Sequence, residues 1–255
     1  FVASCVVTDK AKQKWIRFVK QSLDTLSEWE KLYLSGCASI RHGKIDEHFF
    51  AAHIELEPWK SKIVLLPEDP DDLNEGKVKS LTTLKKMLPA LSTRKYLVIQ
   101  TGCDNFCTFC LTVMARWKHI SKPEAEILEE IRHFVESWGK EVVLTGTNLG
   151  AWGAENSNFF THSRFPYLLE KILKETNISR IRISSLWVEF VSDELLKVIQ
   201  AFPERINPYF HLSIQSWSDT ILKKMNRHYD QKTLISTLEK LSQLEDSYDI
   251  PVNLG

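Results

Sequence analysis

Three cysteines lie close together in the segment Thr-Gly-Cys-Asp-Asn-Phe-Cys-Thr-Phe-Cys, which spans residues 101–110. Cys103, Cys107 and Cys110 form a C-x-x-x-C-x-x-C pattern, and a loop this short can direct three sulfur atoms at one point. Thiolates are the ligands that hold iron–sulfur clusters. A cubane cluster has four irons, so three thiolates leave one iron open. The spacing therefore predicts an iron–sulfur cluster with a free coordination position.

Zinc binding and disulfide formation are the alternatives for these thiols. A structural zinc site usually takes four ligands from two close pairs, and no fourth cysteine or histidine lies at a suitable spacing. His119 is nine positions beyond Cys110, which is a loose fit. Five cysteines in 255 residues are also too few, and an odd number, for a disulfide framework. A zinc site stays open as the weaker interpretation.

The composition is that of a globular protein without a strong charge bias. The 255 residues are 43% hydrophobic, which is enough to bury one large core or two modest ones. Lys and Arg number 33, as do Asp and Glu, so no overall basic charge points to nucleic acid. No apolar run approaches the ~20 residues of a membrane span. Reduced, clustered cysteines favour the cytoplasm. The chain starts without Met and closes within an apparent strand, so we expect it to be truncated at both ends.

The first part of the chain predicts a small parallel α/β domain over residues 1–76. Apolar runs indicate strands and apolar positions at helical spacing indicate helices; we expect strands at 1–7, 31–35 and 63–66, and helices at 10–26 and 44–56. Cys5 and Cys37 then lie at the carboxyl ends of strands, where open α/β sheets bind ligands. Either cysteine could equally be a core residue. Residues 77–94 are polar and basic and are expected to form a linker.

From residue 95 to residue 255 strands and helices alternate regularly. The pattern predicts strands at 96–99, 141–145, 180–184, 209–214 and 250–254, and helices at 124–138, 167–173, 193–201, from 218 onwards, and at 233–244. Ser121 and Glu124 have the spacing of a capping box before the first of these helices. Five parallel strands with outer helices indicate most of a TIM-like (βα)6 barrel without its last strand, in which the residues after each strand face one mouth.

The cysteine spacing resembles the signature of the radical S-adenosylmethionine superfamily, and nearly the whole chain resembles its methylthiotransferases. The segments Ala-Ser-Cys-Val-Val-Thr around Cys5 and Ser-Gly-Cys-Ala-Ser around Cys37 are similar to the family's segments for a second cluster. The stretch Val-Leu-Thr-Gly-Thr-Asn-Leu-Gly-Ala-Trp-Gly at 143–153 resembles the branch that acts on N6-threonylcarbamoyladenosine in tRNA. Arg-Ile-Ser-Ser at 182–185, His-Leu-Ser-Ile-Gln-Ser at 211–216 and Lys-Met-Asn-Arg-His-Tyr at 224–229 complete the similarity.

This resemblance implies two [4Fe–4S] clusters. Cys103, Cys107 and Cys110 would hold the radical cluster, which reduces S-adenosylmethionine to methionine and a 5′-deoxyadenosyl radical. That radical would take hydrogen from C2 of the modified adenosine in the anticodon loop of tRNA. Cys5 and Cys37 would hold the second cluster together with a third cysteine upstream of Phe1, and sulfur would be delivered there. The resemblance also implies an electron donor and a sulfur donor as partners. It implies no association with a membrane.

The resemblance also assigns cosubstrate contacts. They are Phe109, Arg116, Gly146, Thr147, Asn148, Ser184, Ser185, Gln215 and Arg227. Glycine would let the backbone approach the cosubstrate at Gly146 and Gly150, although both could be ordinary turn glycines. Two positions depart from the family pattern. Trp187 stands where an acidic residue is frequent, with Glu189 close by, and Trp217 replaces a glycine.

Three other functions remain open from the sequence. The chain could act on isopentenyladenosine in tRNA or on a ribosomal protein, as other branches of the methylthiotransferases do. It could also be a non-catalytic module that keeps the fold and binds RNA or a partner protein, an interpretation motivated by Trp187 and Trp217.

Overall fold

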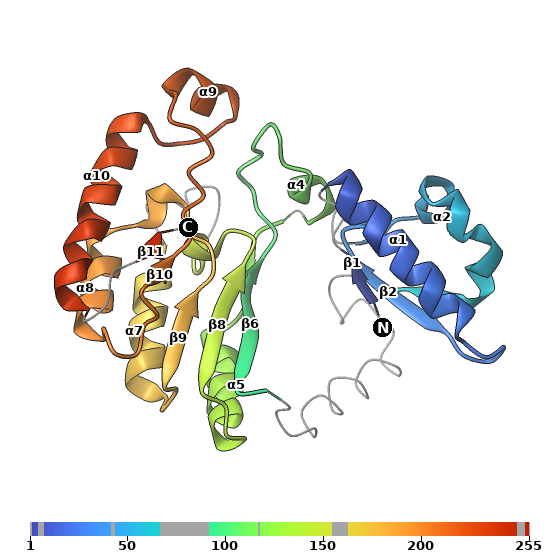
Figure 1. Cartoon of the computed structure of the whole chain (residues 1–255), viewed down its shortest axis with the longest axis horizontal. Coiled ribbons are helices and arrows are strands. Elements are labelled where there is room, and N and C mark those ends of the chain that lie inside the picture. Colours follow the sequence, from blue (N-terminus) through green and yellow to red (C-terminus); the bar gives the residue numbers. More distant parts are fainter. Residues whose placement is uncertain are drawn as a thin grey trace. The chain divides into compact units, whose positions relative to one another are not determined.

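A computed structural model describes residues 2–4, 8–41, 44–66, 92–116, 118–154, 163–248 and 253–254 (Figure 1). The chain divides into two compact units, which we describe separately. The first comprises residues 1–87 and 109–118, and the second comprises residues 88–108 and 119–255. Most of the expected linker lies outside the described residues, and Arg94, its last residue, already begins a strand.

The first unit contains a small parallel sheet. Its strands are β1 (Val2–Ser4), β2 (Leu32–Gly36) and β5 (Ile63–Leu65), in the order β1-β2-β5 with every pairing parallel. Helix α1 (Asp9–Asp24) begins where the Thr8 side chain accepts a hydrogen bond from the Ala11 N–H, and it buries Val19 and Leu23. Leu34 from β2 and Phe49 complete the centre of this core. The parallel α/β arrangement expected for this region is confirmed.

The helix expected over residues 44–56 is only partly correct. The segment forms the short strands β3 (Ile40–Arg41) and β4 (Lys44–Ile45), then α2 (Phe49–Ala52), then a 3₁₀ helix at Ile54–Lys62. Strands β3 and β4 pair antiparallel. Lys44 and Ile45 are extended in that pairing, and His53 has a non-helical backbone (φ −132°, ψ 56°) that ends α2, so one helix over 44–56 does not form.

The second unit contains most of the strands. They are β6 (Arg94–Thr101), β7 (Ile120–Ser121), β8 (Glu141–Gly146), β9 (Arg180–Ile183), β10 (Tyr209–Phe210) and β11 (Asn253–Leu254). One sheet has the order β7-β6-β8-β9, in which β6, β8 and β9 are parallel and β7 is antiparallel. Strands β10 and β11 form a separate parallel pair. Single bridges from Ile181 to Ile206 and from Leu186 to Leu212 connect β9 to the segment that carries β10.

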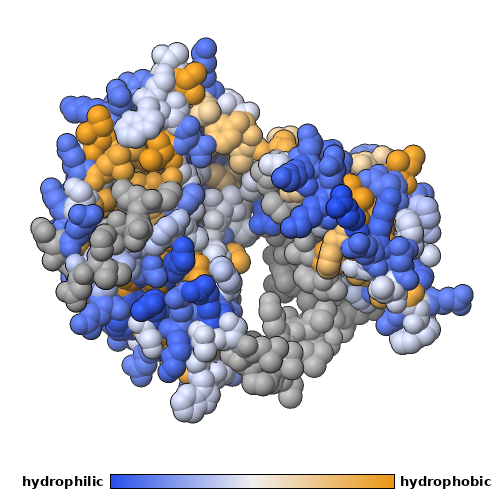
Figure 2. Space-filling model, viewed as in Figure 1, coloured by the Kyte–Doolittle hydropathy of each residue, from blue (hydrophilic) through white to orange (hydrophobic). Residues whose placement is uncertain are grey.

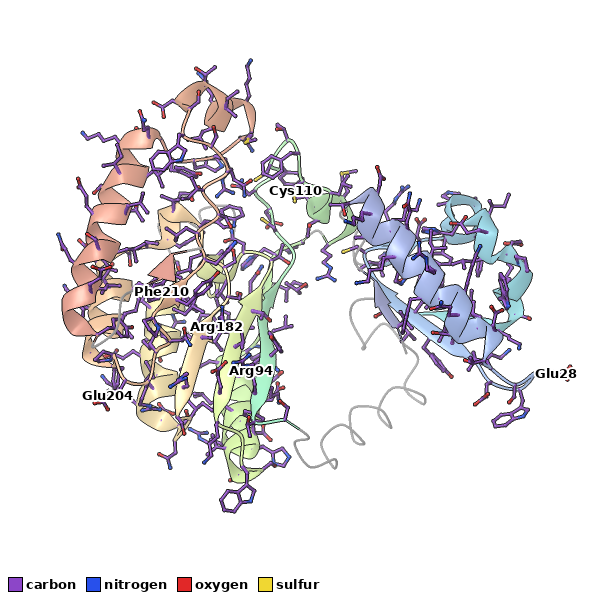
Figure 3. The ribbon with its side chains drawn as sticks, in the orientation of Figure 1. Glu28, Arg94, Cys110, Arg182, Glu204 and Phe210 are labelled. Atoms are coloured by element: carbon purple, nitrogen blue, oxygen red, sulfur yellow. The ribbon has the colours of Figure 1, made fainter. Side chains whose placement is uncertain are left out.

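Helices cover one face of these strands. They are α5 (Glu124–Glu136), α7 (Phe165–Glu175), α8 (Asp193–Ala201) and α10 (Gln231–Ser242), with the short α9 (Asp219–Lys224) before the last (Figure 1). Their buried stripes join Leu97 and Ile99 of β6, Leu144 of β8 and Ile181 of β9 in one hydrophobic core. Alternate residues of each strand face the other way, as the period of a strand requires. Arg182 is one of these residues and projects from β9 (Figure 3).

Three details of the expected barrel need correction. The five predicted strands are all found, but they lie in two separate hydrogen-bonded sheets among the described residues. The strand expected at 209–214 covers only Tyr209–Phe210. Ser121 is not a helix cap: α5 begins after Pro123, and the Ser121 hydroxyl accepts a hydrogen bond from the Gly153 N–H instead. The antiparallel strand β7 was not expected, because two residues carry no detectable alternation.

The outer surface is mixed in character. Figure 2 shows hydrophilic residues over most of the visible face, with hydrophobic residues gathered where α9 and α10 lie. Ile221 of α9 and Ile235 of α10 are both exposed. Within the described part of the chain, no helix has the length and apolar character needed to cross a membrane.

Candidate active site

The cysteine loop leaves the carboxyl end of β6. Gly102 adopts a φ of +67°, and Phe106 a φ of +51°, so the backbone turns sharply on both sides of Cys103. Cys103 and Cys107 are buried, and Cys110 is partly exposed. None of the three forms a disulfide within the described residues. Cys103 and Cys107 are therefore reduced thiols in the loop that follows a parallel strand, where α/β proteins bind ligands.

The loop is bonded to a segment more than a hundred residues away in the sequence. The Asn105 side chain donates to the Asn226 carbonyl at 3.1 Å, and the Asn226 side chain donates to the Asn105 carbonyl at 2.7 Å. Thr108 reinforces this contact, because its N–H donates to the Met225 carbonyl and its hydroxyl to the Lys224 carbonyl at 2.9 Å. Asn226 itself has a φ of +56°. The segment 224–227 thus fixes the shape of the cysteine loop.

Two N–H donors face the sulfur of Cys107. Asn105 Nδ2 lies 2.9 Å from Cys107 Sγ, and Arg227 Nη1 lies 3.7 Å from it. Hydrogen bonds to ligand sulfur affect the reduction potential of a bound iron–sulfur cluster. Cys107 Sγ thus has polar partners that a cysteine packed only among apolar side chains lacks.

Gln100 connects the loop to the strand beside it. Its side chain is buried, and its Nε2 donates to the carbonyls of Thr101 and Gly102 at 2.7 and 2.6 Å. Its Oε1 accepts the N–H of Asn148 at 2.7 Å, directly after β8. Nε2 also lies 2.9 Å from His119 Nδ1, and burial lowers the pKa of that histidine. One side chain therefore holds the start of the cysteine loop against the Gly146–Asn148 turn.

Three predicted contacts, Gly146, Thr147 and Asn148, lie at the end of β8 and in the turn that follows it. The Asn148 side chain is buried, and neither its Nδ2 nor its Oδ1 has a hydrogen-bond partner among the described residues. A buried amide with free donors and acceptors can bind a ligand at little further cost, because its desolvation has already occurred. Asn148 is thus well suited to contact a polar cosubstrate.

Packing against neighbouring residues explains why glycine occupies positions 146 and 150. A Cβ on Gly146 would lie 3.0 Å from Gln100 Oε1 and 3.1 Å from its carbonyl oxygen, because the two residues face each other in the sheet. A Cβ on Gly150 would lie 2.4 Å from the Phe190 Cγ. Close packing within the protein accounts for both positions without any ligand.

The remaining predicted contacts of the second unit lie after β9 and β10. Ser185 Oγ is 3.1 Å from His211 Nδ1 and 3.0 Å from Ser213 Oγ, so these side chains form one hydrogen-bonded group. Ser184 is bonded through its N–H to the Leu144 carbonyl. Gln215 is exposed, with a φ of +66°. Serine and histidine after neighbouring strands provide polar groups at the same edge as the cysteine loop.

The two tryptophans that depart from the family pattern behave differently. Trp187 is buried, and its ring lies 4.1 Å from the guanidinium of Arg227. Trp217 is exposed. Position 187 therefore contributes an aromatic face in place of the expected carboxylate.

Four predicted residues belong to the first unit by their contacts. Cys37 directly follows β2 and is partly exposed. Phe109 is exposed, and Cys110 is next to it in the chain. Arg116 ends the short helix α4 (Thr112–Ala115). Cys5, the other candidate ligand of a second cluster, lies outside the described residues.

The donor set fits an iron–sulfur cluster by its chemistry. Three cysteines that form no disulfide occur within eight positions, and one of them already accepts N–H hydrogen bonds. Within the described residues, no three side chains of His, Cys, Asp or Glu, those of Cys103, Cys107 and Cys110 included, are gathered closely enough to hold a single metal ion. Cysteine sulfur is the ligand type that iron–sulfur clusters require.

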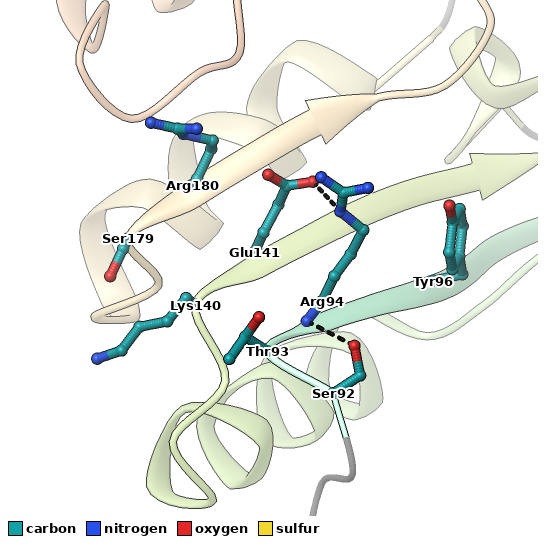
Figure 4. Close-up of a pocket in the computed structure, with 8 residues that line it drawn as sticks. All are labelled: Ser92, Thr93, Arg94, Tyr96, Lys140, Glu141, Ser179 and Arg180. Atoms are coloured by element: carbon teal, nitrogen blue, oxygen red, sulfur yellow. Dashed lines mark hydrogen bonds and ion pairs between the residues drawn. The ribbon is translucent and has the colours of Figure 1, made fainter.

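A large cavity lies elsewhere and is a poor candidate. It has a volume of about 650 Å³ and is lined by Ser92, Thr93, Arg94, Tyr96, Lys140, Glu141, Ser179 and Arg180 (Figure 4). Arg94, Glu141 and Arg180 are the first residues of β6, β8 and β9. The cavity is thus at the amino ends of the strands, roughly 23 Å along β6 from the cysteine loop. Arg94 and Glu141 form an ion pair there at 2.5 Å.

Sequence reasoning missed several residues that shape the site. Gln100, Asn105 and Asn226 lay within recognised segments, but nothing in the sequence indicated their bonds. Glu189 was noted only as a nearby acid. Gln100 bonds to Asn148, 48 positions away, and Asn105 bonds to Asn226, 121 positions away. Only the folded chain reveals such distant partners.

The family model of the radical SAM superfamily matches residues 97–252 of this chain. The chain is also similar to a Thermotoga maritima protein named threonylcarbamoyladenosine tRNA methylthiotransferase MtaB, with 31% identity that covers 99% of this chain and 58% of the relative. A ribosomal protein uS12 methylthiotransferase RimO from Alkaliphilus oremlandii is 29% identical, covering 94% of this chain and 55% of the relative. A tRNA-2-methylthio-N(6)-dimethylallyladenosine synthase from Syntrophotalea carbinolica is 30% identical over 61% of this chain and 35% of the relative.

Among solved structures, the chain is similar to the cobalamin-dependent S-adenosylmethionine radical enzyme OxsB. The TM-score is 0.59 at 13% identity, and the match covers 99% of this chain and 39% of the other. At this identity the likeness concerns the fold alone. The chain spans little more than half the length of the MtaB and RimO relatives that match nearly all of it. The superfamily match and the named relatives lead to one conclusion: the chain belongs to the radical SAM superfamily and, within it, to the methylthiotransferase family.

Proposed function

We propose that this chain is the catalytic part of a tRNA methylthiotransferase that converts N6-threonylcarbamoyladenosine beside the anticodon into its 2-methylthio derivative. The observation that carries this proposal is the match to the T. maritima MtaB across 99% of the chain. MtaB proteins from Bacillus subtilis and Aquifex aeolicus, each 35% identical over shorter segments, add support. The stretch at 143–153, with its Thr-Gly-Thr-Asn-Leu-Gly sequence, favours the same branch.

In this proposal Cys103, Cys107 and Cys110 hold the radical [4Fe–4S] cluster, which when bound supplies the electron for cleavage of S-adenosylmethionine. The protein's own contribution is to position the ligands. Gln100 fixes the start of the cysteine loop, and Asn226 fixes its middle. The buried amide of Asn148 offers hydrogen bonds to the polar end of the cosubstrate.

Cys37, together with Cys5 and a third ligand, would hold a second cluster at which sulfur is delivered. In that arrangement residues 1–76 form the methylthiotransferase domain and residues 95–255 form the partial barrel. The anticodon loop of tRNA, an electron donor and a sulfur donor are the partners, and the reaction takes place in the cytoplasm.

Anaerobic reconstitution with iron and sulfide tests the radical chemistry. We expect the chain to form 5′-deoxyadenosine from S-adenosylmethionine in the presence of dithionite. Cys107→Ala should abolish this product, because it removes a cluster ligand. Cys37→Ala is the matched comparison and should retain 5′-deoxyadenosine formation, because it leaves all three ligands of the radical cluster in place. If the wild-type chain binds the cluster and cleaves no cosubstrate, a non-catalytic binding module is the correct interpretation.

Mass spectrometry of modified nucleosides tests the substrate. A strain that lacks the gene should lose 2-methylthio-N6-threonylcarbamoyladenosine and regain it on complementation. Loss of the isopentenyladenosine derivative, or of methylthiolation on a ribosomal protein, would instead assign the chain to one of the other two branches, to which some of its relatives belong by name.

A further inference from the structure

Arg227 is a buried cation next to the cysteine loop. Its side chain is only 2% exposed and lies 3.6 Å from the carboxylate of Glu189, whose side chain is 6% exposed. The guanidinium also lies over the ring of Trp187 at 4.1 Å and near the ring of Tyr229 at 5.4 Å. A charge in this position has lost nearly all of its contact with water, which is costly unless its partners compensate.

The partners of Arg227 do not compensate fully. Its Nε has no hydrogen-bond partner among the described residues, and the same holds for both carboxylate oxygens of Glu189. Burial raises the pKa of Glu189, although the charge of Arg227 opposes this effect. Apolar side chains of similar size commonly stabilise a fold as well as a buried ion pair does. Stability alone therefore gives a weak reason for Arg227.

The position of the guanidinium suggests a second reason. Nη1 faces Cys107 Sγ at 3.7 Å, and Nη2 lies 3.4 Å from the Ser213 carbonyl oxygen. The preceding residue, Asn226, is held in a left-handed conformation and hydrogen-bonds to the loop twice: its backbone carbonyl accepts from Asn105 Nδ2, and its side-chain Nδ2 donates to the Asn105 carbonyl. The backbone that carries Arg227 is thus fixed relative to the sulfur, and Trp187 and Glu189 restrict the rotation of the side chain.

We infer that Arg227 is a positioning residue that raises the reduction potential of an iron–sulfur cluster bound through Cys107. Reduction adds one electron to the cluster, so a neighbouring cation that donates an N–H to the ligand sulfur stabilises the reduced form more than the oxidised form. Glu189 and Trp187 hold the guanidinium in place. This inference rests on the cluster of the proposed function and is independent of the nucleic-acid substrate.

The test is an anaerobic redox titration of the reconstituted full chain, monitored by electron paramagnetic resonance without tRNA. Arg227→Met alone leaves the Glu189 carboxylate buried without its partner, so the double variant Arg227→Met/Glu189→Gln is made as well. In the double variant we expect about a tenfold lower ratio of reduced to oxidised cluster at a fixed applied potential, a downward shift of about 59 mV for a one-electron couple. In the single variant the shift should be larger, since an unpaired negative charge remains.

Arg205 provides a matched control. It is also an arginine with buried contacts in the same unit, but it donates only to backbone carbonyls, at Leu173, Thr176 and Ile178. Arg205→Met should lower thermal stability and leave the potential unchanged. An unchanged or higher potential in the double variant would overturn the inference. So would a folded double variant that retains no iron, because Arg227 would then serve cluster binding and not its potential. Failure to modify tRNA would refute the proposed substrate without affecting this measurement.

Discussion

At the scale of single residues, Gly150 shows how a sequence pattern and its physical cause can differ. A glycine in a cofactor-binding stretch suggests an approach of the backbone to a ligand. In the fold, Gly150 is buried and lies against Phe190, where an added Cβ would be 2.4 Å from Cγ and 2.5 Å from Cβ of that residue. The contact involves atoms close to the Phe190 backbone, which cannot move aside without displacing the chain.

We expect Gly150→Ala to lower the free energy of unfolding by about 2–3 kcal/mol, because overpacking at this position requires a backbone shift. Gly139→Ala is the control. A Cβ there would meet the outer ring atoms of Phe134 at 2.4–2.5 Å, and a ring edge can swing away. Its cost should be near 1 kcal/mol. Thermal unfolding measures both, and binding of S-adenosylmethionine to folded Gly150→Ala should be unchanged. Weaker binding with unchanged stability would favour a ligand contact instead.

The residues that do the chemistry were easier to predict than those that hold them. Cys103, Cys107 and Cys110 lie within eight positions, so their spacing alone indicates shared ligation. The bonds of Asn105 and Gln100 could not be predicted, because asparagine and glutamine occur in loops for many reasons and their partners are distant in sequence. Arg227 was named as a cosubstrate contact, but its contact with Cys107 Sγ appears only in the fold.

At the scale of elements, α5 is joined to the edge of the sheet by a charged cluster. Glu130 of α5 forms ion pairs with Lys95 of β6, at 2.6 Å, and with Lys122, which follows β7. Burial opposes the charged form of Glu130, but the two ammonium groups outweigh it, so its pKa lies below the ordinary value. One carboxylate thus links three consecutive elements of the βαβ unit that carries the cysteine loop.

The depressed pKa of Glu130 predicts the direction of a pH effect. A carboxyl group with a lower pKa in the folded state stabilises that state above its unfolded pKa, near 4.5, and the stabilisation is lost as the pH falls further. We expect Glu130→Gln to cost about 1 kcal/mol at pH 7, since the cluster is about one-third exposed and solvent weakens each pair. The difference from wild type in chemical denaturation should shrink as the pH falls below 4.5. Glu129→Gln, on the exposed side of the same helix, should have little effect in either pH range.

Elements were predictable where periodicity extends over several residues. The helix at 193–201 was predicted with its observed bounds, since Ser192 caps it and its apolar residues repeat at helical spacing. The failures are short or depend on distant contacts. Strand β7 exists because Gln100 and Thr101 of β6 offer it hydrogen-bonding partners, which no local pattern can show. The 44–56 segment has helical composition, but the β3–β4 pairing and the non-helical backbone of His53 interrupt it, and neither is visible in a local pattern.

At the scale of the whole molecule, each unit has its own hydrophobic core. The core of the second unit is built on the strands β6, β8 and β9 and their helices, with Leu144 fully buried. The smaller core of the first unit is built on β2 and α1, with Leu34 fully buried. A smaller domain buries a smaller fraction of its surface and is correspondingly less stable.

This arrangement predicts two unfolding transitions, the first of them in the smaller unit. Leu34→Ala should destabilise the first unit by about 2–5 kcal/mol and shift only the lower transition, whereas Leu144→Ala should shift only the upper one by a similar free energy. Differential scanning calorimetry of both variants and the wild type measures this, because substitutions in independent cores do not couple. A single transition that both variants lower equally would show that the units unfold as one cooperative body.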